Sequence, residues 1–129
     1  MRILLDTQCW IWMTSFSGRL SSRAREMVAS IDNELMLSAA SSWEIVIKYG
    51  LGKLRLPEPP ERFIPSRLQA FRTGALSIEH EHVLRVGALP SHHRDPFDLL
   101  LIAQAQIEGL PILTADQIFS KYDVEVIDA

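Results

Sequence analysis

Short apolar segments alternate with helix-like segments along this 129-residue chain, and this alternation limits the possible folds more than any other feature. Strands alternating with helices favour a parallel sheet covered by helices on both faces. We therefore expect an α/β fold, with a single domain over residues 1–129 and a small parallel sheet of about five strands flanked by helices on both faces. Apolar runs typical of buried strands occupy residues 2–5, 35–39, 76–78, 111–114 and 124–127.

The intervening segments carry helix signals. Ser22 is a candidate N-cap for a helix whose apolar positions end at Ile31, and Gly109 follows a nearly all-apolar segment. Pro65 falls inside another helical pattern and is a candidate kink. The helices predicted from these patterns cover residues 8–16, 22–31, 41–50, 61–73, 79–88 and 97–108, with a short helical turn at 117–120.

The overall composition excludes several classes of protein. The formal net charge of −3, from 13 Lys and Arg against 16 Asp and Glu, is not that of a strongly basic nucleic-acid binder. A single cysteine, Cys9, excludes an internal disulfide framework and a cysteine-based zinc site, and favours a reducing, cytoplasmic location. The longest uncharged run, residues 7–18, is too short to span a membrane.

Four acidic residues are expected to meet at one edge of the predicted sheet. Asp6 and Asp116 follow two of the strands, while Glu44 and Asp98 lie near the starts of two helices, which begin at the same edge. Ligands of such sheets bind outside the carboxyl ends of the strands. Clustered carboxylates repel each other, and Mg²⁺ or Mn²⁺ relieves the repulsion because it prefers oxygen ligands. The pattern therefore indicates a Mg²⁺ or Mn²⁺ site suited to phosphodiester chemistry.

Each acid also has a purely structural interpretation. Glu44 fits a capping box with Ser41, and Asp98 fits the third helical position behind an Asp95 N-cap and a proline. Asp6 and Asp116 fit the ends of strands. Capping and metal binding are compatible roles, so these interpretations do not exclude the metal site.

Five short stretches of the sequence, taken in order, match a known family. They are residues 4–7 with Trp10 and Trp12, 38–45, 48–54, 93–98 running into 100–105, and 113–116. In the order of these motifs, the chain resembles the PIN-domain family, and within it the VapC-type ribonuclease toxins of VapBC toxin–antitoxin pairs. The resemblance implies a Mg²⁺- or Mn²⁺-dependent endoribonuclease, the toxin component of a type II toxin–antitoxin system. It implies a homodimer neutralised by a VapB-like antitoxin. Leu99 departs from the family, which often has Arg at this position.

The resemblance assigns the catalytic acids to Asp6, Glu44, Asp98 and Asp116. We expect Asp6 and Asp98 to be direct metal ligands, with Glu44 and Asp116 completing a second metal site or binding through water. Hydroxyl groups of Thr7 and Thr114, and the Asp95 carboxylate, are expected to support these acids.

A basic stretch could bind RNA phosphates. Residues 48–72 contain six basic and two acidic residues, although a solvated helix face is the alternative. The candidate RNA contacts are Lys48, Lys53, Arg55, Arg94 and His93. Both His80/His82 and His92/His93 are predicted to be surface residues rather than metal ligands, and Cys9 to be a packed residue rather than a nucleophile.

Three alternatives to a nuclease have to be considered from the sequence. A catalytically silent, dimeric PIN-like binding module would lack one of the four acids, and all four are present. A haloacid dehalogenase-type phosphatase with Asp6 as nucleophile would need a second Asp at position 8, which is Gln. A phospho-receiver domain would need an Asp at the end of the third strand, where the chain has Glu79 and His80.

Overall fold

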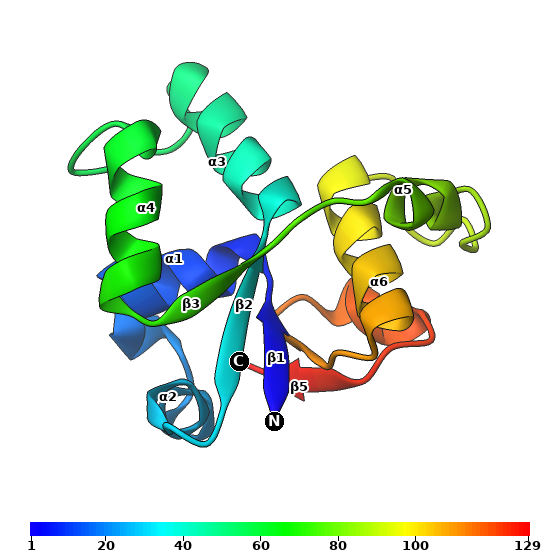
Figure 1. The fold of residues 1–129 in the computed structure, drawn as a ribbon, viewed down its shortest axis with the longest axis horizontal. Coiled ribbons are helices and arrows are strands. Elements are labelled where there is room, and N and C mark those ends of the chain that lie inside the picture. Colours follow the sequence, from blue (N-terminus) through cyan, green and yellow to red (C-terminus); the bar gives the residue numbers. More distant parts are fainter.

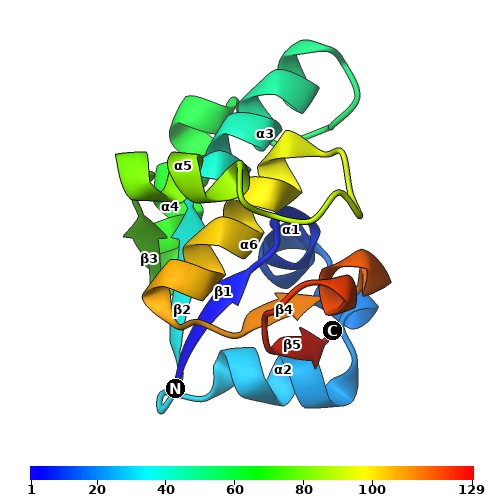
Figure 2. The ribbon, with the colours of Figure 1, turned by 90° about the vertical axis from the view of Figure 1, so that its right-hand side faces the viewer.

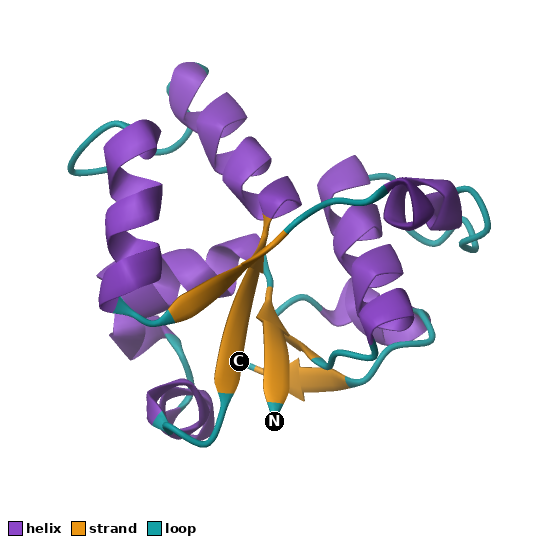
Figure 3. Ribbon diagram, in the orientation of Figure 1, coloured by secondary structure: helices purple, strands orange, loops and turns teal.

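A five-stranded, wholly parallel sheet forms the centre of the molecule (Figures 1 and 3). The computed structural model describes residues 1–129, and its strand order is β3-β2-β1-β4-β5. The predicted α/β fold class and parallel sheet are confirmed. The strands are β1 (Arg2–Leu5), β2 (Glu34–Ser38), β3 (Thr73–Leu76), β4 (Ile112–Thr114) and β5 (Val126–Asp128).

Helices cover both faces of this sheet, and Figure 2 shows α6 crossing in front of β1 and β2. None of the helices is long and apolar enough to cross a membrane. The α-helices are α1 (Thr7–Ser15), α2 (Ser22–Ala29), α3 (Ala39–Gly50), α4 (Pro60–Ala70), α5 (His80–Val86) and α6 (Pro96–Glu108), and two 3₁₀ helices are η1 (Ser17–Arg19) and η2 (Gln117–Lys121).

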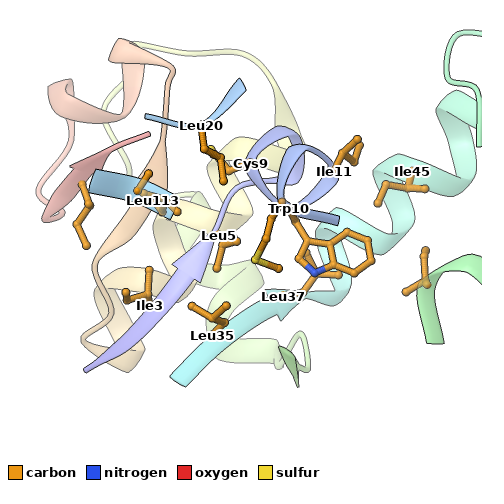
Figure 4. Packing of buried hydrophobic residues seen from close by; sticks show 14 of the residues in the cluster. Ile3, Leu5, Cys9, Trp10, Ile11, Leu20, Leu35, Leu37, Ile45 and Leu113 are labelled. Atoms are coloured by element: carbon orange, nitrogen blue, oxygen red, sulfur yellow. The ribbon is translucent and has the colours of Figure 1, made fainter. Parts of the chain in front are cut away.

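The alternation of side chains along the strands divides the core into two layers. Ile3 and Leu5 of β1 point to the face covered by α1, α2, α3 and α4, where Trp10 is fully buried (Figure 4). Phe63 of α4 belongs to the same layer and is also fully buried. Leu4 points to the opposite face and packs with α6 and η2. Because both faces are covered, the central strands are apolar at nearly every position.

The carboxyl ends of the central strands lead directly into the segments that carry the acids. Asp6 follows β1 and serves as the N-cap of α1, and its backbone N–H still donates to Leu113 O of β4. Ser38 ends β2 and caps α3, while Asp116 follows β4 and caps η2. At this edge of the sheet, α6 begins behind the Asp95 cap, with Pro96 in its first turn as predicted.

Several predicted boundaries are wrong. The N-cap of α2 is Ser21 rather than Ser22, and the helix ends at Ala29, so that Ile31 lies beyond it and is 88% exposed. Pro65 does not break α4, which continues through it. The third strand covers residues 73–76 rather than 76–78, and the preceding helix stops at Ala70.

The start of α3 also differs from the prediction. It begins at Ala39, and its cap is Ser38, whose Oγ accepts a hydrogen bond from Ala40 N. Glu44 therefore lies in the second turn and forms no capping box with Ser41. The structural interpretation of Glu44 as a capping residue is wrong, and the buried carboxylate needs another explanation.

Candidate metal centre

All four predicted acids line one cavity at the carboxyl edge of the sheet. The cavity has a volume of about 490 Å³ and is bounded by α1, α3, the start of α6 and the segment after β4. Asp95 and two lysines, Lys48 and Lys53, also line it. These seven side chains carry five formal negative and two positive charges when all are ionised, so the cavity attracts cations.

Asp6 is the most tightly held of the four carboxylates. Its Oδ1 accepts from Cys9 N at 2.7 Å and its Oδ2 accepts from Thr114 Oγ1 at 2.6 Å. Burial raises the pKa of Asp6, these hydrogen bonds oppose the shift, and the charge of Asp116 adds to it. The side chain is fixed in orientation, which suits a ligand that must keep its geometry.

Glu44 has one satisfied oxygen and one unsatisfied oxygen. Its side chain is 6% exposed, and Lys48 Nζ donates to Oε2 at 2.5 Å. Oε1 is buried and has no hydrogen-bond partner. A buried carboxylate oxygen without a hydrogen-bond donor destabilises the folded state. We therefore expect Oε1 to contact a cation, or an ordered hydrogen-bond donor, from outside the chain.

Asp98 lies in the first turn of α6, where its Oδ2 is 2.8 Å from His93 Nε2. Burial raises the pKa of Asp98 to about 6, the contact with His93 opposes the shift, and the charges of Asp95 and Glu44 add to it. Side-chain ligand atoms of His93, Asp95 and Asp98 come within 4.8 Å of one another. This is a group of three that could hold a metal ion.

The supporting hydroxyl groups differ in what they contact. Thr114 joins two of the acids, because its Oγ1 donates to Asp6 and accepts from Asp116 N at 3.0 Å. Thr7 lines the cavity, but its hydroxyl donates to Ser41 Oγ at 2.9 Å rather than to a carboxylate. Asp116 itself is exposed and caps η2 through Ile118 N.

The donor set fits a hard divalent cation. All of these oxygens come from carboxylates. Burial and neighbouring negative charges disfavour the ionised forms of Asp6 and Asp98, and Oε1 of Glu44 has no hydrogen-bond partner. Mg²⁺ and Mn²⁺ prefer such ligands.

A second group of possible ligands, Glu81, His82 and Glu108, does not fit a metal equally well. His82 Nδ1 accepts from Glu79 N at 2.9 Å, so Nε2 carries the proton and donates to Glu108 Oε1 at 3.0 Å. Neither ring nitrogen has a free lone pair for a cation. His82 is also fully buried, so its prediction as a surface residue is wrong.

The predicted RNA contacts separate into two groups. Lys48, Lys53 and His93 lie at the cavity or in contact with its acids. Arg55 and Arg94 are exposed and do not line it. The Lys48–Glu44 ion pair was not foreseen, although the i,i+4 spacing on one helix is a known signal for such pairs.

Comparison with known proteins identifies the family. Residues 3–125 match the model of the PIN domain. The chain belongs to the PIN domain family. Over an aligned segment of 61 residues, this PIN domain is 44% identical to ribonuclease VapC16 of Mycobacterium tuberculosis. The aligned segment covers 47% of this chain and 43% of that relative.

Solved structures show the same PIN architecture over almost the full length. VapBC2 from Rickettsia felis, bound to a DNA fragment from its promoter, has a TM-score of 0.72 and 18% identity, covering 99% of this chain and 98% of the other. DNA-bound VapBC from Salmonella typhimurium has a TM-score of 0.69 at 18% identity, with the same coverage. At this identity the likeness concerns the fold.

The residue that departs from the family's frequent Arg, Leu99, is part of the fold here. It is half-buried and packs against the core layer formed by α6 and η2. Cys9 is fully buried, and burial raises the pKa of its thiol, in accord with a packed residue.

Proposed function

We propose that this PIN domain is a Mg²⁺- or Mn²⁺-dependent endoribonuclease and the toxin component of a type II toxin–antitoxin system. The observation that carries the proposal is the convergence of Asp6, Glu44, Asp98 and Asp116 on one cavity that also contains an orphaned carboxylate oxygen. The family and the partial match to a ribonuclease support the same class of reaction.

We assign Asp6 and Asp98 as direct ligands of the cation, with Glu44 and Asp116 completing the site or acting through water. A divalent cation held there would lower the pKa of a bound water and offset charge on the phosphate that is attacked. Thr114 orients Asp6 and holds the backbone that presents Asp116. Near neutral pH, His93 beside Asp98 favours the ionised carboxylate that a cation needs.

The RNA chain would enter along the basic side of the cavity. Lys48 and Lys53 line it, and phosphate contacts from such residues orient a substrate without reading its sequence. Arg55 and Arg94 are exposed and would extend this path beyond the cavity. We expect the substrate in the cytoplasm, where the buried free Cys9 also fits a reducing environment.

Partner chains are part of the proposal. The similar structures from Rickettsia felis and Salmonella typhimurium are VapBC complexes, which supports a VapB-like antitoxin for this chain. Homodimer formation is supported by large apolar side chains that are exposed on α3, directly after α3 and on α5. They are Trp43, Val46, Leu51, Val83 and Leu84, each at least 51% exposed.

The test is cleavage of a mixed RNA pool with Mg²⁺, with Mn²⁺ and with chelator. We expect cleavage only with a divalent cation, and a loss of at least about 100-fold in Asp6→Asn and Asp98→Asn, because each removes a charged ligand. Asp123→Asn, which removes an exposed acid outside the cavity, is the control for a general charge effect. Equal cleavage by the wild type and both acid variants would overturn the mechanism.

Expression in cells separates the toxin from a silent binding module. We expect growth arrest that either acid variant relieves, although both variants keep the fold and any partner surface. Arrest that persists in Asp6→Asn and Asp98→Asn would favour a binding module instead.

A further inference from the structure

Lys48 is the one lysine or arginine that is hydrogen-bonded to a carboxylate that we assign to catalysis. It lies one turn after Glu44 on α3, and its Nζ is 2.5 Å from Glu44 Oε2. The two side chains differ in exposure, since that of Lys48 is 50% exposed and that of Glu44 is 6% exposed. The ammonium group therefore approaches a buried carboxylate from the open side of the cavity.

Lys48 also shares its cavity with Asp95 and Asp98, the two acids at the start of α6. Lys48 thus already supplies one positive charge to the acids that we assign to the cation. Lys53 lines the same cavity and forms no ion pair, so it provides a matched comparison.

An ordinary helical ion pair does not account for this arrangement. Such pairs on helix surfaces contribute little to stability, and they join two solvated groups. Here Lys48 satisfies only Oε2 of a buried carboxylate and leaves Oε1 without a partner. Only one of the two carboxylate oxygens therefore has a hydrogen-bond partner, as expected if Oε1 binds another cation.

On the basis of the nuclease function proposed above, we propose that Lys48 is a tethered counter-cation that exchanges Glu44 for an RNA phosphate. Its ammonium group holds Glu44 while the acids hold no divalent cation. When Glu44 turns to a divalent cation, the long and half-exposed lysine side chain is free to bind a phosphodiester oxygen of the substrate. Lys48 is then both a positioning residue for Glu44 and a phosphate contact.

This exchange predicts two effects of opposite sign. Removing the ammonium group removes a competitor for Glu44, so affinity for a divalent cation increases. It also removes a phosphate contact, so more RNA is needed for half-maximal cleavage. If the ion pair were purely structural, removing Lys48 would change the affinity for the divalent cation no more than removing the unpaired Lys53 does.

The experiment compares the full chain with Lys48→Met and the control Lys53→Met. Mn²⁺ binding is measured by titration calorimetry without RNA, and cleavage is followed against RNA concentration at saturating Mn²⁺. We expect Lys48→Met to bind Mn²⁺ about tenfold more tightly, and Lys53→Met to change affinity by about threefold or less, because only Lys48 contacts a ligand. The RNA concentration for half-maximal cleavage rises about tenfold in Lys48→Met.

Two further variants complete the design. Lys48→Arg keeps the positive charge and should restore both values to within about threefold of the wild type. Lys48→Gln repeats the neutral test with a polar side chain if the methionine variant folds poorly.

Equal Mn²⁺ affinities in Lys48→Met and Lys53→Met, or weaker binding in Lys48→Met, would overturn the exchange while leaving the nuclease function in place. A wild-type chain that binds no Mn²⁺ and cleaves no RNA would instead overturn the proposed function, and the exchange with it.

Discussion

Asp98 is a largely buried carboxyl group whose surroundings disfavour its charge. Its pKa is raised to about 6 from an ordinary 3.8, so the folded state retains this proton more strongly than the unfolded chain. The corresponding stability is present below about pH 4 and is lost as pH rises through about 6. Metal-free protein should therefore be less stable at neutral pH than Asp98→Asn, which carries no such charge.

We expect Asp98→Asn to exceed the wild type by up to about 3 kcal/mol at pH 7.5, and to match it near pH 4, in the presence of chelator. Urea unfolding across this pH range measures the difference. Asp123→Asn, an exposed acid outside the cavity, is the control. A constant difference between wild type and Asp98→Asn at all pH values would contradict the shifted pKa.

The hydroxyl group of Thr114 forms two hydrogen bonds that we expect to stabilise the fold. Thr114→Val keeps the shape but leaves both Asp6 Oδ2 and Asp116 N without their partner. Each buried group that loses its hydrogen bond costs about 1–3 kcal/mol, so we expect a loss in that range or above it. Thr114→Ser keeps the hydroxyl and should stay within about 1 kcal/mol of the wild type in denaturant unfolding. Equal stabilities of the valine and serine variants would show that the hydroxyl is not needed.

At the scale of the elements, a buried side-chain amide connects four parts of the fold. Gln104 is fully buried in α6, where its Oε1 accepts from Ser38 Oγ and its Nε2 donates to Ser77 O at 3.1 Å. Because Ser38 also caps α3, this amide connects β2, α3, α6 and the segment after β3. It fixes the relative position of the two helices that carry Glu44 and Asp98.

We expect Gln104→Leu to destabilise the fold by about 2–4 kcal/mol, since it leaves a buried hydroxyl and a carbonyl without partners. Ser38→Ala combined with Gln104→Leu should cost less than the sum of the single changes, because the pair is then removed together. Chemical unfolding of the four proteins of this cycle measures the coupling. Additive losses would mean that the two side chains do not interact.

The sequence could predict the elements whose signals are local. The caps of α6, its αL Gly109 and the apolar core strands all carry such signals. Strand β3 does not, because its sequence contains Gly74 and pairs at the sheet edge. A Cβ at Gly74 would lie 2.9 Å from Met36 Sδ of β2, so a larger residue here would require the Met36 side chain to move. Tertiary contacts of this kind cannot be deduced from one segment.

For the site, too, some features could be predicted from the sequence and others depend on tertiary contacts. The four acids could be placed together because parallel strands end at one edge, a rule of topology rather than of local sequence. The contacts of His93 with Asp98 and of Lys48 with Glu44 depend on rotamers and on the true start of α3. The burial of His82 depends on the packing of α5 against α6. The polar neighbours Glu81 and Arg85 give no sign of this packing in the sequence.

At the scale of the whole molecule, the net charge of −3 conceals an uneven distribution of charge. The acids of the cavity lie on four separate segments: the junction of β1 and α1, helix α3, the start of α6 and the turn after β4. Their mutual repulsion therefore opposes closure of the fold. A divalent cation that binds them in the folded chain alone must stabilise the entire molecule, because unfolding separates its ligands.

We expect Mn²⁺ at 100 times its dissociation constant to stabilise the wild type by about 2.7 kcal/mol. Asp6→Asn should lose most of this gain, because Asp6 joins β1 to the other three segments. Arg94→Gln should keep the gain, since it leaves every cavity acid in place. Thermal unfolding with Mn²⁺ and with chelator measures both. If Mn²⁺ stabilised Asp6→Asn as much as the wild type, Mn²⁺ would bind away from the cavity. If only Asp6→Asn lost this stabilisation, the stability of the whole fold would depend on cation binding by the cavity acids.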